Sequence, residues 1–181
     1  MAVWTIGHST RSLADLRALL RAHGVASVVD VRRLPHSRRH PQFDTVARAC
    51  DLPAAGVAYH HAPGLGGFRR PRPASTNTAI REPAFRGYAD YMQTDEFASH
   101  LATLIELAAQ VPTAIMCAEA RPESCHRFFI ADALVAHGVE VHHILDAGAP
   151  LPHALQPDAR VAHGRVTYPG PPDLFSAADA G

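Results

Sequence analysis

Reactive side chains are concentrated in one stretch of the chain, between Thr113 and Gly138. Two of the three cysteines, Cys117 and Cys125, lie there, and His126 follows the second of them. A thiolate can act as a nucleophile, a carboxylate or an imidazole can move protons, and an arginine can bind an anion. The stretch therefore has the residue types of a cysteine-dependent active site. The candidates in it are Cys117, Glu119, Cys125, His126 and Arg127.

The same stretch predicts a strand, a loop and a helix. Residues 113–116 are an apolar run after Pro112, and apolar residues with helical spacing follow Cys125. A cysteine at a helix start has its thiolate stabilised by the helix dipole and by nearby cations. We expect Cys125 at, or within one residue of, the helix start, capped by Glu123 or Ser124, and we rank Cys125 ahead of Cys117 as nucleophile. The alternative is that both thiols are core residues, since free cysteine is often buried.

A metal site is a competing interpretation of these residues. Cys117, Glu119, Cys125 and His126, with a distant His8, have the ligand atoms of a mixed site. Adjacent residues of a helix point about 100° apart, however, which is awkward for shared ligation by Cys125 and His126. Neither CxxC nor HExxH spacing occurs. We therefore expect no metal and no cofactor. A Cys117–Cys125 disulfide would instead make the loop a redox switch.

The N-terminal part predicts a βαβ unit. Residues 2–6 and 25–31 are predicted strands, and the helix between them begins after Ser12 and stops at Gly24. Because the carboxyl ends of parallel strands meet at one edge of a sheet, His8 and Ser9 should lie near Asp30. The catalytic candidate His8 then joins the edge that carries Cys117.

Arginine dominates the basic residues, since the chain has no lysine. Between residues 32 and 86, ten arginines stand against three acidic residues, a net charge of +7, whereas the whole chain is neutral. Arginine suits bidentate recognition of phosphate or carboxylate. Coding bias and a solvated surface explain the same residues. The loop after Asp30 supplies the candidates Arg32, Pro35, Ser37 and Arg38 for an anion site.

The middle of the chain contains a long irregular segment, residues 61–83, after a predicted strand at 57–60. Gly66 and Gly67 allow close backbone approach, and the neighbouring Phe68 could stack on a base. A mobile basic loop is the alternative. Predicted helices begin at Pro83, with Tyr88 on the apolar face, and after Thr94. The remaining predicted strands are 139–145 and 165–168.

Composition limits the class of protein. The chain has 181 residues, no apolar run that could span a bilayer and no secretory signal pattern, and three cysteines fit a reducing compartment. We expect a cytoplasmic protein with no membrane partner. We expect one α/β domain over residues 1–147 and a C-terminal extension over 148–181, with the last ten residues disordered.

Several of these motifs resemble one family. They are Thr5 to Ser9, Asp30 to Arg32, Pro35 with Ser37 and Arg38, Leu65 to Gly67, Gly87 with Tyr88, and Cys117 to Arg127. In order and spacing the chain is similar, over residues 3–146, to the bacterial and archaeal domain of unknown function 488. The resemblance implies one compact α/β domain with the motifs at strand ends, and it implies no biochemical activity.

A looser likeness is to rhodanese-like domains. Asp30 to Arg32 after a strand, and a cysteine that closes a later strand, are similar to that pattern. The loop after Cys117 lacks the glycines of an amide cradle, which argues against sulfur transfer.

We therefore expect a three-layer α/β/α domain with a mostly parallel sheet of about five strands and a site at its carboxyl edge. The first functional hypothesis is a thiolate enzyme that acts on an anionic nucleotide or nucleic-acid-like substrate, with Glu119, His8 or His126 moving protons. The alternatives are a non-catalytic nucleotide- or nucleic-acid-binding module and a metal-dependent hydrolase. The sequence leaves the oligomeric state open. The substrate-binding candidates are Ser9, Asp30, Arg32, Pro35, Ser37, Arg38, Gly66, Gly67, Tyr88 and Arg127.

Overall fold

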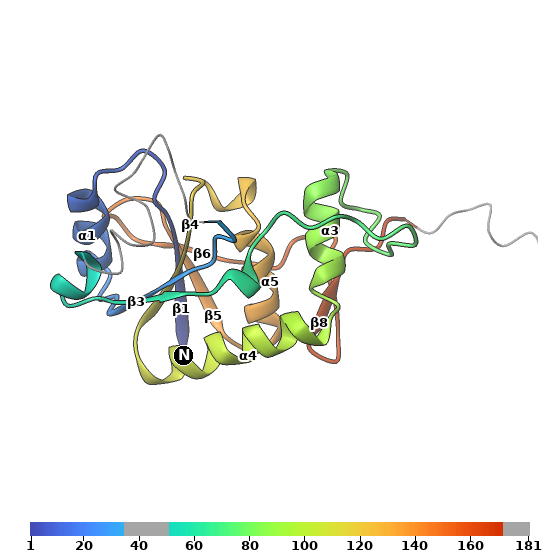
Figure 1. The fold of residues 1–181 in the computed structure, drawn as a ribbon. Helices are drawn as coiled ribbons and strands as arrows, with labels where there is room; N and C mark the ends of the chain where they lie inside the picture. The colour runs from blue at the N-terminus through green and yellow to red at the C-terminus, as the bar shows by residue number, and fades with distance from the viewer. Residues whose placement is uncertain (35–50, 172–181) are drawn as a thin grey trace, which may run out of the picture.

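Six strands form the main sheet, in the order β3-β2-β4-β1-β5-β6. A computed structural model of the chain describes residues 1–34 and 51–171 (Figure 1). The parallel strands are β1 (Ala2–Gly7), β2 (Ser27–Asp30), β3 (Ala58–His61), β4 (Thr113–Cys117) and β5 (Glu140–Ile144). A sixth strand, β6 (Leu151–Pro152), is antiparallel to β5. The prediction of a mostly parallel sheet is confirmed, and the extra strand comes from the C-terminal extension.

Helices cover both faces of this sheet (Figure 1). The helix α1 (Leu13–Ala22) packs Leu16 and Leu20 against Ile6 and Val28 on one face. On the other face, α3 (Pro83–Tyr91), α4 (Asp95–Gln110) and α5 (Arg127–Ala136) share a core with Val3 and Ile115. Successive strand residues alternate between the two cores, as the pleat requires. The predicted three-layer α/β/α arrangement is confirmed.

Local capping explains where the predicted helices begin. Ser12 and Asp15 form a capping box at the start of α1, and Gly24 follows the helix with φ of +66°. Thr94 accepts a hydrogen bond from the Phe97 amide, 3.2 Å away, at the start of α4. None of the helices in the described part of the chain has the length and hydrophobicity of a membrane span.

The neighbouring strands β1 and β4 are followed by helices on opposite faces. The helix after β1 is α1, on the face of Leu16, and the helix after β4 is α5, on the face of Ile115. The strand ends lie side by side, with Gly7 paired to Cys117. Connections that leave in opposite directions open a crevice at the carboxyl edge of such a sheet, where ligands bind. The fold therefore places Cys117 at this crevice.

The C-terminal extension packs on the domain. Besides β6 it contains a hairpin of β7 (Arg160–Ala162) and β8 (Arg165–Thr167), which overlaps the predicted strand at 165–168. Tyr168 after the hairpin is fully buried against Phe129 of α5, with ring centroids 5.3 Å apart. Residues 151–168 thus contribute to both the sheet and the core. The predicted disorder of the last ten residues lies outside the described residues.

A buried polar network holds this extension to the sheet. The carboxylate of Asp132 on α5 accepts hydrogen bonds from Tyr168 Oη at 2.7 Å and Gln156 Nε2 at 2.7 Å, and His153 Nε2 lies 2.8 Å away. His153 Nδ1 lies 3.0 Å from His143 Nε2. Because buried polar groups are costly unless they are paired, the network fixes the position of the extension.

The network makes the fold sensitive to acid at His143. Burial, followed by the neighbouring His153 and Arg127, lowers the pKa of His143 from 6.5 to about 4. The ring also faces Thr5, at 2.7 Å, and Phe128, with His142 and Asp132 nearby. As the pH falls from 6.5 towards 4, the unfolded chain binds a proton here that the folded chain does not, so stability falls.

We expect His143→Gln to flatten the fall of the free energy of unfolding between pH 6.5 and 4, measured by urea denaturation. His142→Gln is the matched control, because the His142 side chain is partly exposed beside Glu140. Equal pH dependence in the wild type and the His143 variant would show that His143 does not carry the effect.

Candidate functional site

A cavity of about 800 Å³ opens at the carboxyl edge of the sheet. The connections after β1, β2, β3 and β4 contribute to its wall, together with α3 and the turn before α5. This is the edge at which the sequence placed the site. The predicted site residues that line the cavity are His8, Ser9, Arg32, Gly67, Tyr88, Cys117, Glu119, Cys125 and His126.

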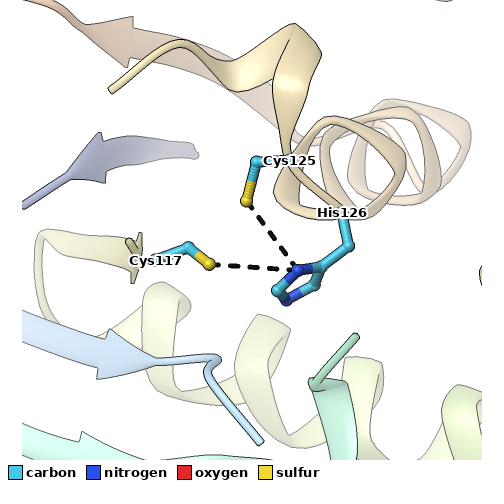
Figure 2. A group of neighbouring side chains, drawn as sticks. All are labelled: Cys117, Cys125 and His126. Atoms are coloured by element: carbon cyan, nitrogen blue, oxygen red, sulfur yellow. Dashed lines mark hydrogen bonds between the residues drawn. The ribbon is translucent and has the colours of Figure 1, made fainter. Parts of the chain in front are cut away.

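Cys117, Cys125 and His126 form a close cluster in the cavity wall. His126 Nδ1 lies 3.9 Å from Cys117 Sγ and 3.8 Å from Cys125 Sγ, and all three atoms lie within 4.8 Å of one another. Figure 2 shows the two sulfurs approaching the imidazole from the end of β4 and from the turn before α5. Both thiols are free and buried, with 6% and 3% of the residue surface exposed.

The turn before α5 differs from the sequence prediction. Pro122–Ser124 form a 3₁₀ turn, Cys125 is extended with φ of −143° and ψ of 146°, and α5 begins at Arg127 with His126 as its N-cap. The predicted caps, Glu123 and Ser124, are therefore wrong. Cys125 is extended and lies outside the helix, so the 100° angle between adjacent helical residues does not apply to Cys125 and His126. The Cys125 sulfur and His126 Nδ1 lie 3.8 Å apart.

His126 is fixed in one orientation. Its Nε2 lies 3.0 Å from the Val31 carbonyl oxygen, which can only accept, so Nε2 carries a proton. Nδ1 faces the two sulfurs, where it accepts from a thiol when the ring is neutral and donates to a thiolate when the ring is protonated. The Tyr88 ring packs on His126 with centroids 5.2 Å apart. A side chain at Gly67 would put a Cβ 3.0 Å from Nδ1, so this position needs glycine.

The two thiols have opposite electrostatic environments. The neighbouring Cys117 thiol, then His126 and the charge of Arg127, lower the pKa of Cys125 to about 4, against the effect of burial. The neighbouring Cys125 and burial raise the pKa of Cys117 well above its usual value. The pair therefore has one thiol that loses its proton easily, and Cys125 is the thiol of lower pKa.

A second set of polar side chains is joined by short contacts at the end of β2. The fully buried Asp30 carboxylate accepts hydrogen bonds from Arg32 Nη2 at 2.6 Å and Arg32 Nε at 2.8 Å. Arg32 Nη1 lies 3.1 Å from His8 Nε2, and Tyr59 Oη donates to Asp30 at 2.8 Å. Asp30 neutralises Arg32 and orients it, so Asp30 supports the cavity wall without lining it.

The loop after Cys117 is held on both sides. The amides of His8 and Ser9 donate to the carbonyls of Cys117 and Ala118, at 2.9 and 2.8 Å. On the other side of the loop, the guanidinium of Arg127 donates to the carbonyls of Glu119, at 2.6 Å, and Ala120, at 2.9 Å. The loop that carries the Glu119 side chain into the cavity is therefore rigidly placed.

Some predicted site residues have other positions. Arg127 is 1% exposed and does not line the cavity, so it positions the loop and cannot touch a ligand there. Gly66 packs against Arg33 and also lies outside the cavity wall. Pro35, Ser37 and Arg38 lie outside the described residues.

The cavity also contains side chains that the sequence reasoning missed. Leu34, Ala84 and Phe85 line it, and so do Thr10 and Ser124. The position of Phe85 on the apolar face of the helix that begins at Pro83 predicted only a buried core residue. Phe68, considered for stacking, lines the cavity with 82% of its surface exposed. The mouth is thus partly apolar.

The cluster has the composition of a site for a soft metal. Two thiolates and one imidazole are typical ligands of Zn²⁺, and the Val31 carbonyl holds the far nitrogen of the imidazole as a second ligand sphere does. Glu119 and His8 are not part of the group of atoms that lie within 4.8 Å.

Residues 12–134 match the family described as Domain of unknown function DUF488. The chain belongs to this family. The match covers α1, β2, the long irregular segment and the Cys117–His126 cluster, which supports the resemblance seen in the sequence. Comparison with curated proteins and comparison with solved structures each gave no significant match. The likeness to rhodanese-like domains is not shown by these comparisons.

Gly7 tests whether the contact between the β1 and β4 loops positions the site. A Cβ at Gly7 would lie 1.8 Å from the Glu119 carbonyl oxygen and 2.7 Å from its carbon, and both are backbone atoms. We expect Gly7→Ala to cost at least about 1–3 kcal/mol of unfolding free energy, as overpacking does, measured by urea denaturation.

Gly148→Ala is the control, because its Cβ would meet only the end of the Asp146 side chain. Unchanged stability of Gly7→Ala would mean that the two loops do not touch as described.

Proposed function

We propose that this protein is a cysteine-dependent enzyme in which the Cys125 thiolate attacks an anionic substrate bound in the cavity. The observation that carries the proposal is the approach of Cys125 Sγ to His126 Nδ1, 3.8 Å, in the wall of an 800 Å³ cavity, with the imidazole held by the Val31 carbonyl. A nucleophile, a base and a group that orients the base are the parts of a nucleophilic site.

The roles follow from the contacts. Cys125 forms the covalent bond to the electrophilic atom of the substrate, and the leaving group departs with the bonding pair. His126 moves protons, since its Nδ1 faces both sulfurs. The Cys117 thiol lies within 4.8 Å of Cys125 Sγ and helps to lower the pKa of Cys125. Glu119, exposed on the cavity wall, is a second group able to accept a proton.

A nucleotide or nucleic-acid-like substrate fits the charge and shape around the mouth. The chain carries a net charge of +7 between residues 32 and 86. Arg33 at the mouth is exposed and donates to the Phe68 carbonyl at 3.2 Å. Phe68 and Phe85 supply apolar ring surface for a planar group, and guanidinium binds phosphate. Arg32 contributes less, because Asp30 neutralises it.

Alkylation of the cysteines by iodoacetamide, followed by peptide mass spectrometry, tests the proposal. We expect Cys125 to react fast at pH 6 and to keep that rate down to about pH 4, while Cys117 stays unreactive, because only Cys125 is a thiolate there. Cys117→Ser keeps a hydrogen-bond donor and serves as the conservative variant. Reaction of both thiols only after unfolding would contradict the thiolate mechanism.

Nucleotides or inorganic phosphate should slow this alkylation if the anion binds beside the thiolate. A non-catalytic binding module predicts the opposite pattern, with salt-sensitive binding and inert thiols. Arg33→Gln should weaken the protection, and Arg165→Gln is its control, since Arg165 pairs with Asp95 away from the cavity. Equal protection in both variants would exclude Arg33 from the anion site.

A metal-dependent hydrolase is the second candidate, favoured by the three ligand atoms that lie within 4.8 Å of one another. It predicts about one zinc per chain in elemental analysis of protein purified without chelator, lost in Cys125→Ser. The thiolate mechanism predicts metal-free protein and alkylation that is indifferent to chelator. The two candidates are thus separated by one measurement.

A further inference from the structure

The structure brings two free thiols together at one imidazole. Cys117 lies at the end of β4 and Cys125 in the extended turn before α5, yet both sulfurs face His126 Nδ1, at 3.9 and 3.8 Å. Nucleophilic attack needs only one thiol. The second thiol, buried beside the first, has the position of a group that acts after the first bond has formed.

The two sulfurs lie within 4.8 Å of one another, whereas the S–S bond of a disulfide is about 2.05 Å long, so they must move together to form one. The loop after Cys117 is held by the amides of His8 and Ser9 and by the guanidinium of Arg127. Cys117 is thus kept at the wall of the cavity beside Cys125.

We propose that Cys125 and Cys117 form a reactive dithiol that reduces a small-molecule disulfide bound in the cavity. This inference rests on the proposed function, because it takes Cys125 as the nucleophile. It replaces the nucleotide-like substrate with a small-molecule disulfide and gives Cys117 the second step.

The reaction has two balanced steps. The Cys125 thiolate attacks one sulfur of the substrate RSSR, the substrate S–S bond breaks, and one RS⁻ leaves with the bonding pair as Cys125–S–S–R forms. Cys117 then loses its proton to His126 and attacks Cys125 Sγ, which releases the second RS⁻ as the Cys117–Cys125 disulfide forms. The first RS⁻ takes a proton from solvent, and the second takes the proton of Cys117 through His126. The substrate is reduced by two electrons and the protein is oxidised by two.

Exposure favours a small substrate over a protein disulfide. Only 6% of Cys117 and 3% of Cys125 is exposed, so the sulfurs are reached through the cavity. The cavity volume of about 800 Å³ holds a small peptide disulfide but no folded protein surface. A dithiol reductant such as dithiothreitol would return the oxidised protein to its starting state.

The test uses the full chain, with the third cysteine replaced (Cys50→Ser), a chelator present, and glutathione disulfide as the probe. We expect the reduced protein to form the Cys117–Cys125 disulfide and to release two glutathione molecules per chain. Cys117→Ser should stop at a stable glutathionyl adduct on Cys125. In Cys125→Ser the reaction rate should fall by at least about tenfold, since the thiolate that attacks first is missing. Mass spectrometry of intact protein and of peptides identifies each product.

Two results would overturn the inference and leave the proposed function standing. One is a wild-type reaction that stops at the adduct on Cys125, and the other is no reaction with the disulfide while iodoacetamide still labels Cys125 fast. Failure of both reagents at Cys125 would overturn the inference and the proposed function together. Circular dichroism of each serine variant checks that it is folded.

Discussion

The site depends on how closely the backbone after β1 approaches the backbone after β4. Gly7 lies against the Glu119 carbonyl so tightly that no side chain fits, and the His8 and Ser9 amides continue the parallel hydrogen bonding beyond the strands. The buried Arg127 holds the other side of the same loop through two carbonyls. Contacts to the backbone of this loop, from the β1 connection and from Arg127, therefore position Cys117. They do so where the connections of two neighbouring strands leave for opposite faces of the sheet.

The cluster depends in addition on one departure from helical structure. Because Cys125 is extended and precedes the helix, it reaches Cys117, while His126, one residue later, turns back between them and is fixed by the Val31 carbonyl. The thiolate is then stabilised chiefly by the Cys117 thiol, with smaller effects from His126 and Arg127. Cys125 thus lies just before the N-terminus of α5, and its neighbouring side chains lower its pKa.

Hydrophobic periodicity and capping residues were enough to predict the layers of the fold. The capping box at Ser12, the glycine at Gly24 and the buried run at residues 113–116 each act within a few residues, so a single sequence reveals them. The role of Arg127 was wrong because an arginine beside two cysteines suggests a ligand contact, whereas its burial under the loop depends on tertiary packing. The extended conformation of Cys125 was missed because Pro122 does not indicate which conformation the residues after it adopt. Packing of Tyr168 into the core is equally long-range.

The central claim is that the fold holds Cys125 as a thiolate next to His126. The most direct measurement is a pH titration of the ultraviolet absorbance of thiolate, with Cys125→Ser as the blank. The account predicts one thiolate per chain that is lost only as the pH falls to about 4, and that is lost at a higher pH in Cys117→Ala, where the neighbouring thiol is missing. A titration of Cys125 near 9, the ordinary value, or one unchanged by the Cys117 substitution, would contradict it.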